Sequence, residues 1–220
     1  MKISVIITGA TGMVGEGVLL ECLAHPDVER VLIVNRKHYA RTHPKLKELI
    51  VPDFMDLDKV TDELKGYNAC FFCAGVSSVG MKEHEYRHLT YDITLNFAQT
   101  LSDVNDGMVF TYVSGSHTDS TEKGKLMWAR VKGKTENDLF KLHFKNVYAF
   151  RPGIMKPTKG QKSIKTLYKT VWILYPLFRL IAPGQATTLK VVGRAMINCA
   201  LTGYPKHILE VEDIKKLGEE

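Results

Sequence analysis

Hydrophobic positions along the chain alternate between continuous runs and helical stripes. Continuous apolar runs rich in β-branched residues predict buried strands, and such runs lie at 3–8, 31–35, 50–51, 69–74, 108–114 and 147–150. The intervening segments carry helix-forming patterns, which predict helices at 14–23, 44–49, 60–64, 85–101 and 125–143. Strands that alternate with helices favour an α/β fold, in which helices cover both faces of a parallel sheet. We therefore predict a doubly wound parallel sheet.

The length of 220 residues and the lack of a low-complexity linker indicate a single domain. Residues 1–150 contain all the predicted strands, and we expect residues 151–220 to fold over the strand ends as a small substrate or lid region. Hydrophobic residues make up 45% and charged residues 25%, which excludes a disordered, collagen-like or disulfide-dense chain. The chain begins directly with a strand, and its four cysteines are scattered, so we expect a reduced, cytoplasmic location.

Positive charge is concentrated in the C-terminal part of the chain. The net charge is +6, yet residues 139–209 contain twelve Lys and Arg and no Asp or Glu, which leaves −6 for the remainder. Such asymmetry attracts anions to one side. Cofactor phosphates, an acidic substrate and an anionic membrane are the candidate anions, and a solvated basic face is the alternative. Because the basic stretch contains no recognition motif, we expect no nucleic-acid partner.

A glycine-rich turn separates the first strand from the first helix, in the sequence Gly9-Ala10-Thr11-Gly12-Met13-Val14-Gly15. Glycines in this position allow a tight turn, a close approach of a pyrophosphate and close packing of the helix on the strand. The free N–H groups of the helix N-terminus then face the phosphates. We expect a dinucleotide here, with contacts from Gly9, Thr11, Gly12, Met13 and Val14.

The end of the second strand indicates which dinucleotide binds. Sites specific for NAD usually place Asp or Glu there to accept from the ribose 2′-OH, whereas this strand ends in Asn35-Arg36-Lys37. A guanidinium binds a 2′-phosphate that a carboxylate would repel. We therefore predict NADP(H) in preference to NAD(H), with Asn35, Arg36 and Lys37 in the cofactor site. The alternative is that Arg36 and Lys37 are only loop residues.

At this point the sequence resembles the short-chain dehydrogenase/reductase superfamily, in its atypical or extended NAD(P)-binding branch with a Rossmann fold. The resemblance covers nearly the whole chain and includes the glycine turn. It implies that Asp53-Phe54 holds the adenine, Asp53 by a side-chain hydrogen bond, and that Cys73-Ala74-Gly75 lines the ribose. It also implies that Pro152 and Gly153, in the sequence Arg151-Pro152-Gly153, lie near the nicotinamide.

Within this branch, the sequence is most similar to the Tat-interacting-protein-like group. The similarity is carried by V-K-G-K-T-E at 131–136 and by Gly193-Arg194-Ala195-Met196. The best-known members of that group are NADPH-binding regulators whose substrates are poorly defined. The resemblance therefore leaves open whether the chain is an enzyme or a regulator.

The catalytic segment departs from the superfamily pattern. Relatives use Tyr-x-x-x-Lys on one helix, where the lysine lowers the pKa of the phenol so that it exchanges a proton with the substrate. Lys132 occupies the lysine position, but Trp128 stands where the tyrosine belongs. An indole N–H donates a hydrogen bond but does not titrate. We therefore expect Lys132 to bind the ribose, while the usual proton relay is missing.

Other residues offer substitutes for the missing groups. Ser114 or Ser116, after the fifth strand, fills the superfamily's hydroxyl role, and the sequence leaves the choice between them open. His117 is the preferred candidate acid because it follows a strand end, where sites of this fold form. Tyr86 and Tyr91 are weaker candidates, since the helical pattern around Tyr91 favours packing.

Two further patterns predict structure only. Cys70-Phe71-Phe72-Cys73 has the spacing of a redox motif, but it lies in an apolar strand, where alternate side chains face opposite ways. Buried structural thiols are therefore the better interpretation. The eight histidines show no ligand spacing, so we expect no metal.

Residues 163–182 combine an aromatic stripe with lysines at helical spacing. The segment is too short and too charged to cross a bilayer. Three interpretations remain: a lid over the substrate, a helix lying on an anionic membrane, and a subunit interface that would form a homodimer.

Two functions of different classes fit these features. The first is an oxidoreductase that uses NADP(H) to reduce a small carbonyl or enone, including an anionic one, without the usual tyrosine. The second is a non-catalytic NADP(H)-sensing module that controls a partner surface. A nucleotide-sugar epimerase or dehydratase is a weaker third, because that chemistry usually needs the missing tyrosine.

Overall fold

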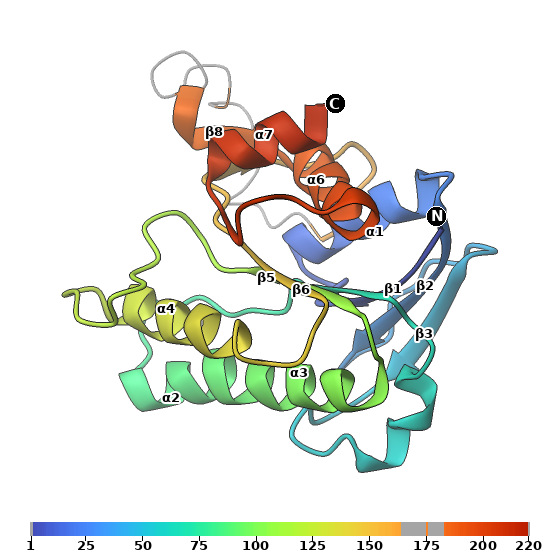
Figure 1. Ribbon diagram of the computed structural model, residues 1–220, viewed down its shortest axis with the longest axis horizontal. Coiled ribbons are helices and arrows are strands. Elements are labelled where there is room, and N and C mark those ends of the chain that lie inside the picture. The colour runs from blue at the N-terminus through green and yellow to red at the C-terminus, as the bar shows by residue number, and fades with distance from the viewer. Residues whose placement is uncertain (1, 164–174, 176–182, 220) are drawn as a thin grey trace.

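The computed structural model describes residues 2–163, 175 and 183–219, which form a seven-stranded sheet with helices on both faces (Figure 1). The strand order is β3-β2-β1-β4-β5-β6-β9, and every neighbouring pair is parallel. The strands are β1 (Ile3–Thr8), β2 (Val28–Asn35), β3 (Leu46–Ile50), β4 (Ala69–Phe72), β5 (Val109–Val113), β6 (Asn146–Phe150) and β9 (Ile208–Leu209). The predicted doubly wound fold, a single Rossmann-like domain, is confirmed.

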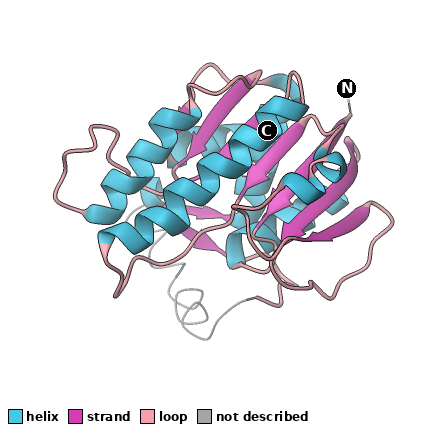
Figure 2. Ribbon diagram, turned by 90° about the horizontal axis from the view of Figure 1, so that it is seen from below, coloured by secondary structure: helices cyan, strands magenta, loops and turns pink. Residues whose placement is uncertain are grey.

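Two helical layers enclose the sheet. One face is covered by α1 (Met13–Ala24), α6 (Leu189–Thr202) and α7 (Val211–Glu219). The other is covered by α2 (Glu83–Arg87), α3 (Ile93–Val104) and α4 (Met127–Leu139), which lie in front of the sheet in Figure 2. Each face therefore has its own hydrophobic core.

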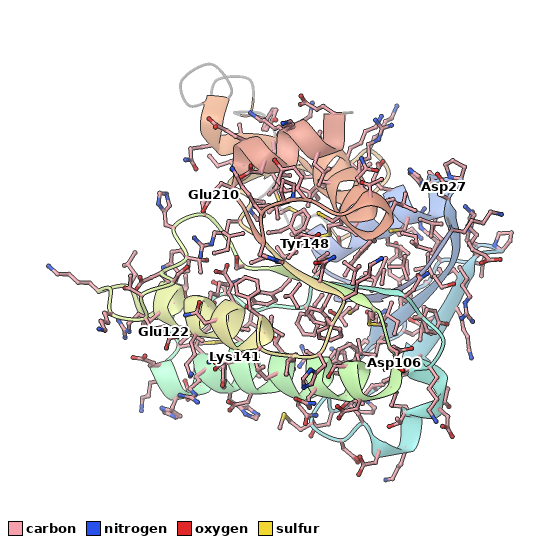
Figure 3. The ribbon with its side chains drawn as sticks, in the orientation of Figure 1. Asp27, Asp106, Glu122, Lys141, Tyr148 and Glu210 are labelled. Atoms are coloured by element: carbon pink, nitrogen blue, oxygen red, sulfur yellow. The ribbon has the colours of Figure 1, made fainter. Side chains whose placement is uncertain are left out.

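The central strands are buried on both sides, which explains their continuous apolar runs. In β1, Ile6 and Ile7 are both fully buried, Ile7 in the core under α1 and α6 and Ile6 in the core on the opposite face. In β6, Tyr148 faces the α6–α7 layer (Figure 3), and its hydroxyl donates to the carbonyl of Tyr204 over 3.3 Å.

The edge of the sheet corrects one prediction. The predicted helix at 44–49 is wrong, because this stretch forms β3 and pairs with β2 from Leu46 opposite Val31 to Ile50 opposite Asn35. β3 is an edge strand, where charged residues such as Lys47 and Glu48 are tolerated. The third strand consequently ends at Ile50 instead of beginning there.

The remaining predicted helices are found, with changed detail. The helix predicted at 60–64 consists of two short 3-10 turns, Asp58–Val60 and Asp62–Leu64. The helix predicted at 85–101 runs from α2 through a π-helical turn at His88–Asp92 into α3.

The C-terminal region contributes elements that the sequence did not predict. β7 (Ile154–Lys156) pairs in parallel with β8 (Ala186–Thr188), which a 3-10 turn at Pro183–Gln185 precedes. α6 packs on α1, and β9 extends the main sheet. Apart from Ser163 and Tyr175, the segment 163–182 lies outside the described residues. Among the described helices, none is long and apolar enough to span a membrane.

Candidate functional site

The glycine turn lies at the point where the strand order reverses, between β1 and β4. Gly9 has a φ of +71°, and a Cβ there would lie 2.7 Å from the Ala74 nitrogen. A Cβ at Gly15 would lie 2.2 Å from the carbonyl oxygen of Gly9. Only glycine therefore permits this close meeting of β1, α1 and the end of β4. In open α/β sheets, ligands bind in the crevice at this reversal point.

The N-terminus of α1 opens toward that crevice. Gly12 caps the helix with extended backbone, and its N–H donates to the Gly9 carbonyl over 2.9 Å. Thr11 and Gly12 are exposed, while Met13 and Val14 are half-buried. A helix N-terminus behind an exposed glycine turn binds phosphate through backbone N–H groups. This turn fits the pyrophosphate of a dinucleotide.

The end of β2 carries two exposed cations beside a buried amide. Asn35 is 3% exposed, and its Oδ1 accepts from the Ala10 N–H over 3.2 Å. Its Nδ2 donates to Glu48 over 3.4 Å. Asn35 therefore fixes the glycine turn, while Arg36 and Lys37, which follow it, are exposed.

The segments after β3 and β4 complete the edge on which a dinucleotide would lie. Asp53 is exposed, and its Oδ1 accepts from the Met55 N–H over 2.9 Å. The ring of Phe54 is buried and stacks on Phe97 with centroids 5.1 Å apart, so Asp53 is the exposed member of this pair.

After β4, Ala74 donates its N–H to Thr8 Oγ1 over 3.1 Å, which keeps this segment beside the glycine turn. Cys73 is half-buried, and desolvation raises the pKa of its thiol to about 12. Gly75 is exposed. Cys73, Ala74 and Gly75 therefore lie where a ligand bound at the turn would pass.

The loop after β5 contains the candidate hydroxyls. Ser114 is 8% exposed, and its hydroxyl donates to the Phe150 carbonyl over 3.1 Å. Ser116 is half-buried, and its hydroxyl donates to the Arg151 carbonyl over a longer 3.4 Å. His117 is exposed and has a φ of +66°. Ser116 and His117 are thus the more accessible of the predicted groups.

Lys132 reaches the same loop from α4. Its Nζ donates to the Ser114 carbonyl over 2.6 Å and lies 3.4 Å from that of Val113. Desolvation lowers the pKa of Lys132 to about 8, although the charge of Glu136 opposes this shift. Trp128 is half-buried one helical turn earlier. A lysine with a lowered pKa at a strand end is typical of functional sites.

Tyr86 and Tyr91, the two weaker candidate acids, are enclosed by packing or bound to other side chains. Tyr86 is 1% exposed, so it lies inside the core. The hydroxyl of Tyr91 donates to Asp138 over 2.8 Å, and its ring lies 4.8 Å from the guanidinium of Arg87. Tyr91 therefore packs between the helices.

Arg151 belongs to a buried ionic network that the sequence did not predict. Its guanidinium donates through Nε to Glu136 over 3.1 Å and through Nη2 to the same carboxylate, which is fully buried. It also contacts Glu210, over 3.2 Å, and the hydroxyl of Ser120. Glu210 lies just before α7 (Figure 3). The network joins α4, β6 and the segment before α7.

This network fixes the backbone near the candidate hydroxyls. Pro152 is buried, its carbonyl accepts from the Ser116 N–H over 3.2 Å, and Gly153 follows just before β7. The motifs containing Glu136 and Arg151 were visible in the sequence, but the contact between these two residues was not.

The cysteines form no site in the described structure. Cys22, Cys70 and Cys199 are buried, and desolvation raises the pKa of all three thiols. No group of three or more His, Cys, Asp or Glu side chains in the described residues is arranged to hold a metal ion.

Relatives with similar sequences cover most of the chain. Protein fmp52, mitochondrial, of Emericella nidulans is 24% identical over 210 residues, covering 90% of this chain and 87% of that protein. Protein HTATIP2 of Rattus norvegicus is 24% identical over 226 residues, covering 99% and 90%. The second match confirms the resemblance to the Tat-interacting-protein-like group.

Solved structures share the fold at low identity. MoeE5 in complex with UDP-glucose and NAD has a TM-score of 0.66 and 17% identity, and the match covers 98% of this chain and 80% of MoeE5. The Bordetella bronchiseptica enzyme WbmF in complex with NAD+ and UDP has a TM-score of 0.67 and 16% identity, with 98% and 76% covered. The model of the NAD dependent epimerase/dehydratase family matches residues 5–123. Because this match spans more than half of the sequence, the chain belongs to the NAD dependent epimerase/dehydratase family.

Proposed function

We propose that this protein is an NADP(H)-dependent oxidoreductase that reduces a small carbonyl or enone. The observation that carries the proposal is the position of Lys132, whose Nζ is held by carbonyls at the end of β5. The glycine turn ends β1 in the same parallel sheet, so both features lie at the same edge. A cofactor and a reacting group therefore share one crevice.

The choice of NADP(H) rests on the end of β2. Asn35 stands where an NAD site usually has a carboxylate. Its buried side-chain amide is hydrogen-bonded to the Ala10 N–H and to the Glu48 carboxylate. Arg36 and Lys37 remain exposed beside it. Two cations favour a 2′-phosphate, which a guanidinium binds through paired hydrogen bonds. Because the C-terminal region is basic and attracts anions, we propose that the substrate is anionic.

Each residue of the candidate site has a separate role in the proposed reduction. The glycine turn, Arg36 and Lys37 would hold the cofactor, whose nicotinamide would supply the hydride. Lys132 orients the ribose and keeps positive charge near the developing oxyanion. Ser116, whose hydroxyl makes only a long contact of 3.4 Å, orients the substrate oxygen in preference to Ser114. Water or the exposed His117 supplies the proton that a tyrosine supplies in relatives.

Trp128 favours a second candidate, a non-catalytic NADP(H)-sensing module. An indole at this position places a group that does not titrate one helical turn before the lysine, where relatives have a tyrosine. A sensor would bind the same cofactor and transmit its occupancy to a partner. Nucleotide-sugar epimerisation or dehydration is the third candidate, supported by the nucleotide-sugar ligands of the structural neighbours.

The test combines cofactor binding with turnover. Wild type, Trp128→Tyr and Arg36→Ala are titrated with NADPH and NADH, and then mixed with a panel of aldehydes, ketones, enones and UDP-sugars. NADPH consumption by wild type would support the oxidoreductase. Tight NADPH binding with turnover only by Trp128→Tyr would support the sensor. We expect Arg36→Ala to weaken NADPH binding about tenfold and to change NADH binding less than about twofold.

We propose a cytoplasmic location. Cell fractionation tests it against a mitochondrial location, because the relative fmp52 is named as mitochondrial. We propose a homodimer, tested by sedimentation at several concentrations. Contact of residues 163–182 with membranes is tested by sedimenting the protein with anionic vesicles at low and high salt.

A further inference from the structure

The first turn of α1 contains a fully buried carboxylate that no step above uses. Glu16 is 0% exposed and follows Gly15 directly. Its oxygens accept hydrogen bonds from the Tyr39 hydroxyl at 2.9 Å, the Lys162 N–H at 2.9 Å, and the Ser163 N–H and hydroxyl at 2.8 and 2.6 Å. Burial alone would raise the pKa of Glu16, but these hydrogen bonds outweigh it and lower that pKa. The carboxylate is therefore well satisfied in its charged form.

These donors come from two segments that are far apart in the sequence. Tyr39 belongs to the loop between β2 and β3, whereas Lys162 and Ser163 follow β7. We call Glu16, Tyr39, Lys162 and Ser163 the Glu16 clasp. The two segments also touch directly, because Lys162 Nζ donates to the Ala40 carbonyl over 3.3 Å.

Two more contacts hold the segment 158–163 on the helix and the loop. Gln161 Nε2 donates to the carbonyl of Met13, in the first turn of α1, over 2.7 Å. Arg41 Nη2 donates to the Gly160 carbonyl over 3.2 Å. The clasp therefore lies beside the turn that fits the pyrophosphate, and it connects that turn to the loop after β2.

Tyr39 is fixed at both its backbone and its side chain. Its N–H donates to Glu48 over 2.7 Å, and its hydroxyl donates to Glu16. Only three residues separate it from Asn35, which is itself buried and bonded to Ala10. Arg36 and Lys37 thus lie on a short, exposed stretch between two buried anchor points. These two anchor points restrict the backbone that carries both cations.

We propose that Glu16 is a positioning residue for NADP(H) selectivity: through Tyr39 it holds the loop that presents Arg36 and Lys37 to the 2′-phosphate. The proposal rests on the proposed binding of NADP(H). A loop fixed in advance loses less conformational entropy when a ligand binds. NADH has no 2′-phosphate, so its affinity does not depend on where these cations lie. Loosening the clasp therefore weakens NADPH binding selectively.

Dissociation constants for NADPH and NADH are measured for wild type, Glu16→Gln and Tyr39→Phe. Tyr39→Phe keeps the ring and removes only the hydroxyl that reaches Glu16. Tyr204→Phe is the matched control, since its hydroxyl donates to Asp213 over 3.0 Å, after α6 and away from the β2 loop. We expect both clasp variants to lower the ratio of NADPH to NADH affinity about fivefold, with the control unchanged.

A merely structural role would weaken both cofactors equally, so an unchanged ratio in folded Tyr39→Phe and Glu16→Gln would overturn the proposal. Hydrogen exchange of the ligand-free proteins provides a second criterion. Tyr39→Phe should accelerate exchange in both 36–45 and 158–163, and acceleration of one segment alone would also overturn it. If wild type binds neither cofactor, the proposed function fails. The exchange result then shows separately whether the clasp joins the two segments.

Discussion

Two buried carboxylates hold opposite sides of the crevice, and they do so with different chemistry. Glu16 and Glu136 are both 0% exposed. Glu136, on the side of β5 and β6, is paired with the guanidinium of Arg151. Glu16, on the side of β1 and β2, accepts from neutral donors, namely two backbone N–H groups and two hydroxyls.

The difference follows from what each carboxylate joins. Glu136 and Arg151 lie on α4 and directly after β6, which are parts of the packed core, so their ion pair forms whenever the domain folds. Glu16 joins two exposed connections, whose ordering costs conformational entropy at every residue. The side of β5 and β6 is therefore held by the packed core, and the side of β1 and β2 by contacts between loops. Breaking the first should affect stability, and breaking the second should affect mainly binding.

The largest effect is expected from Arg151→Met, which leaves Glu136 as a buried charge without its guanidinium. Removing one partner of a buried ion pair typically costs about 3–5 kcal/mol. Urea unfolding at neutral pH measures this loss. Glu210→Gln is the control, because Glu210 is 53% exposed and its contact with Arg151 should contribute under about 1 kcal/mol. Equal losses in the two variants would contradict the assignment of the main interaction to Glu136.

Lys132, on the side of β5 and β6, should give the next largest effect, because burial disfavours its charge. Its folded pKa of about 8 lies below the ordinary value of 10.5. Below pH 8 the ammonium is present in both states, and its burial destabilises the fold. Between pH 8 and 10.5 the folded state releases the proton first, so the stability of wild type relative to Lys132→Met should rise. The interval between these two pKa values corresponds to about 3.4 kcal/mol. Because Lys132 is half-buried, we expect solvent screening to reduce the rise to about 2 kcal/mol, measured by urea unfolding at each pH.

The same contrast explains which parts of the fold were predictable from the sequence. Central strands such as β1 and β4 lie between two cores, and burial on both faces produces the apolar runs that the sequence shows. β3 was misassigned because an edge strand tolerates Lys47 and Glu48. β7, β8 and β9 contain only two or three residues each, too few for any periodicity to appear.

In the candidate site, the local motif was predictable from the sequence, and the contacts between distant residues were not. The glycine turn is a local motif, since its function depends on neighbouring residues and on the strand before it. The contact of Glu16 with Lys162 spans 146 positions, and that of Glu136 with Arg151 spans 15. Whether two such residues meet depends on how the elements pack, and no spacing rule within one element encodes that.

The smallest effect is expected from Glu16→Gln, and its dependence on pH separates the two carboxylates. The folded pKa of Glu16 lies below its ordinary value of 4.5, because donors satisfy the charged form. The advantage of wild type over Glu16→Gln should therefore be complete above about pH 4.5 and disappear as the pH falls through the folded pKa. We expect about 1 kcal/mol at neutral pH, measured by urea unfolding from pH 7 to pH 3. A difference that stays constant over this range would mean that the carboxylate acts through its shape alone. The contrast between charge-assisted loop contacts and a core ion pair would then have to be abandoned for Glu16.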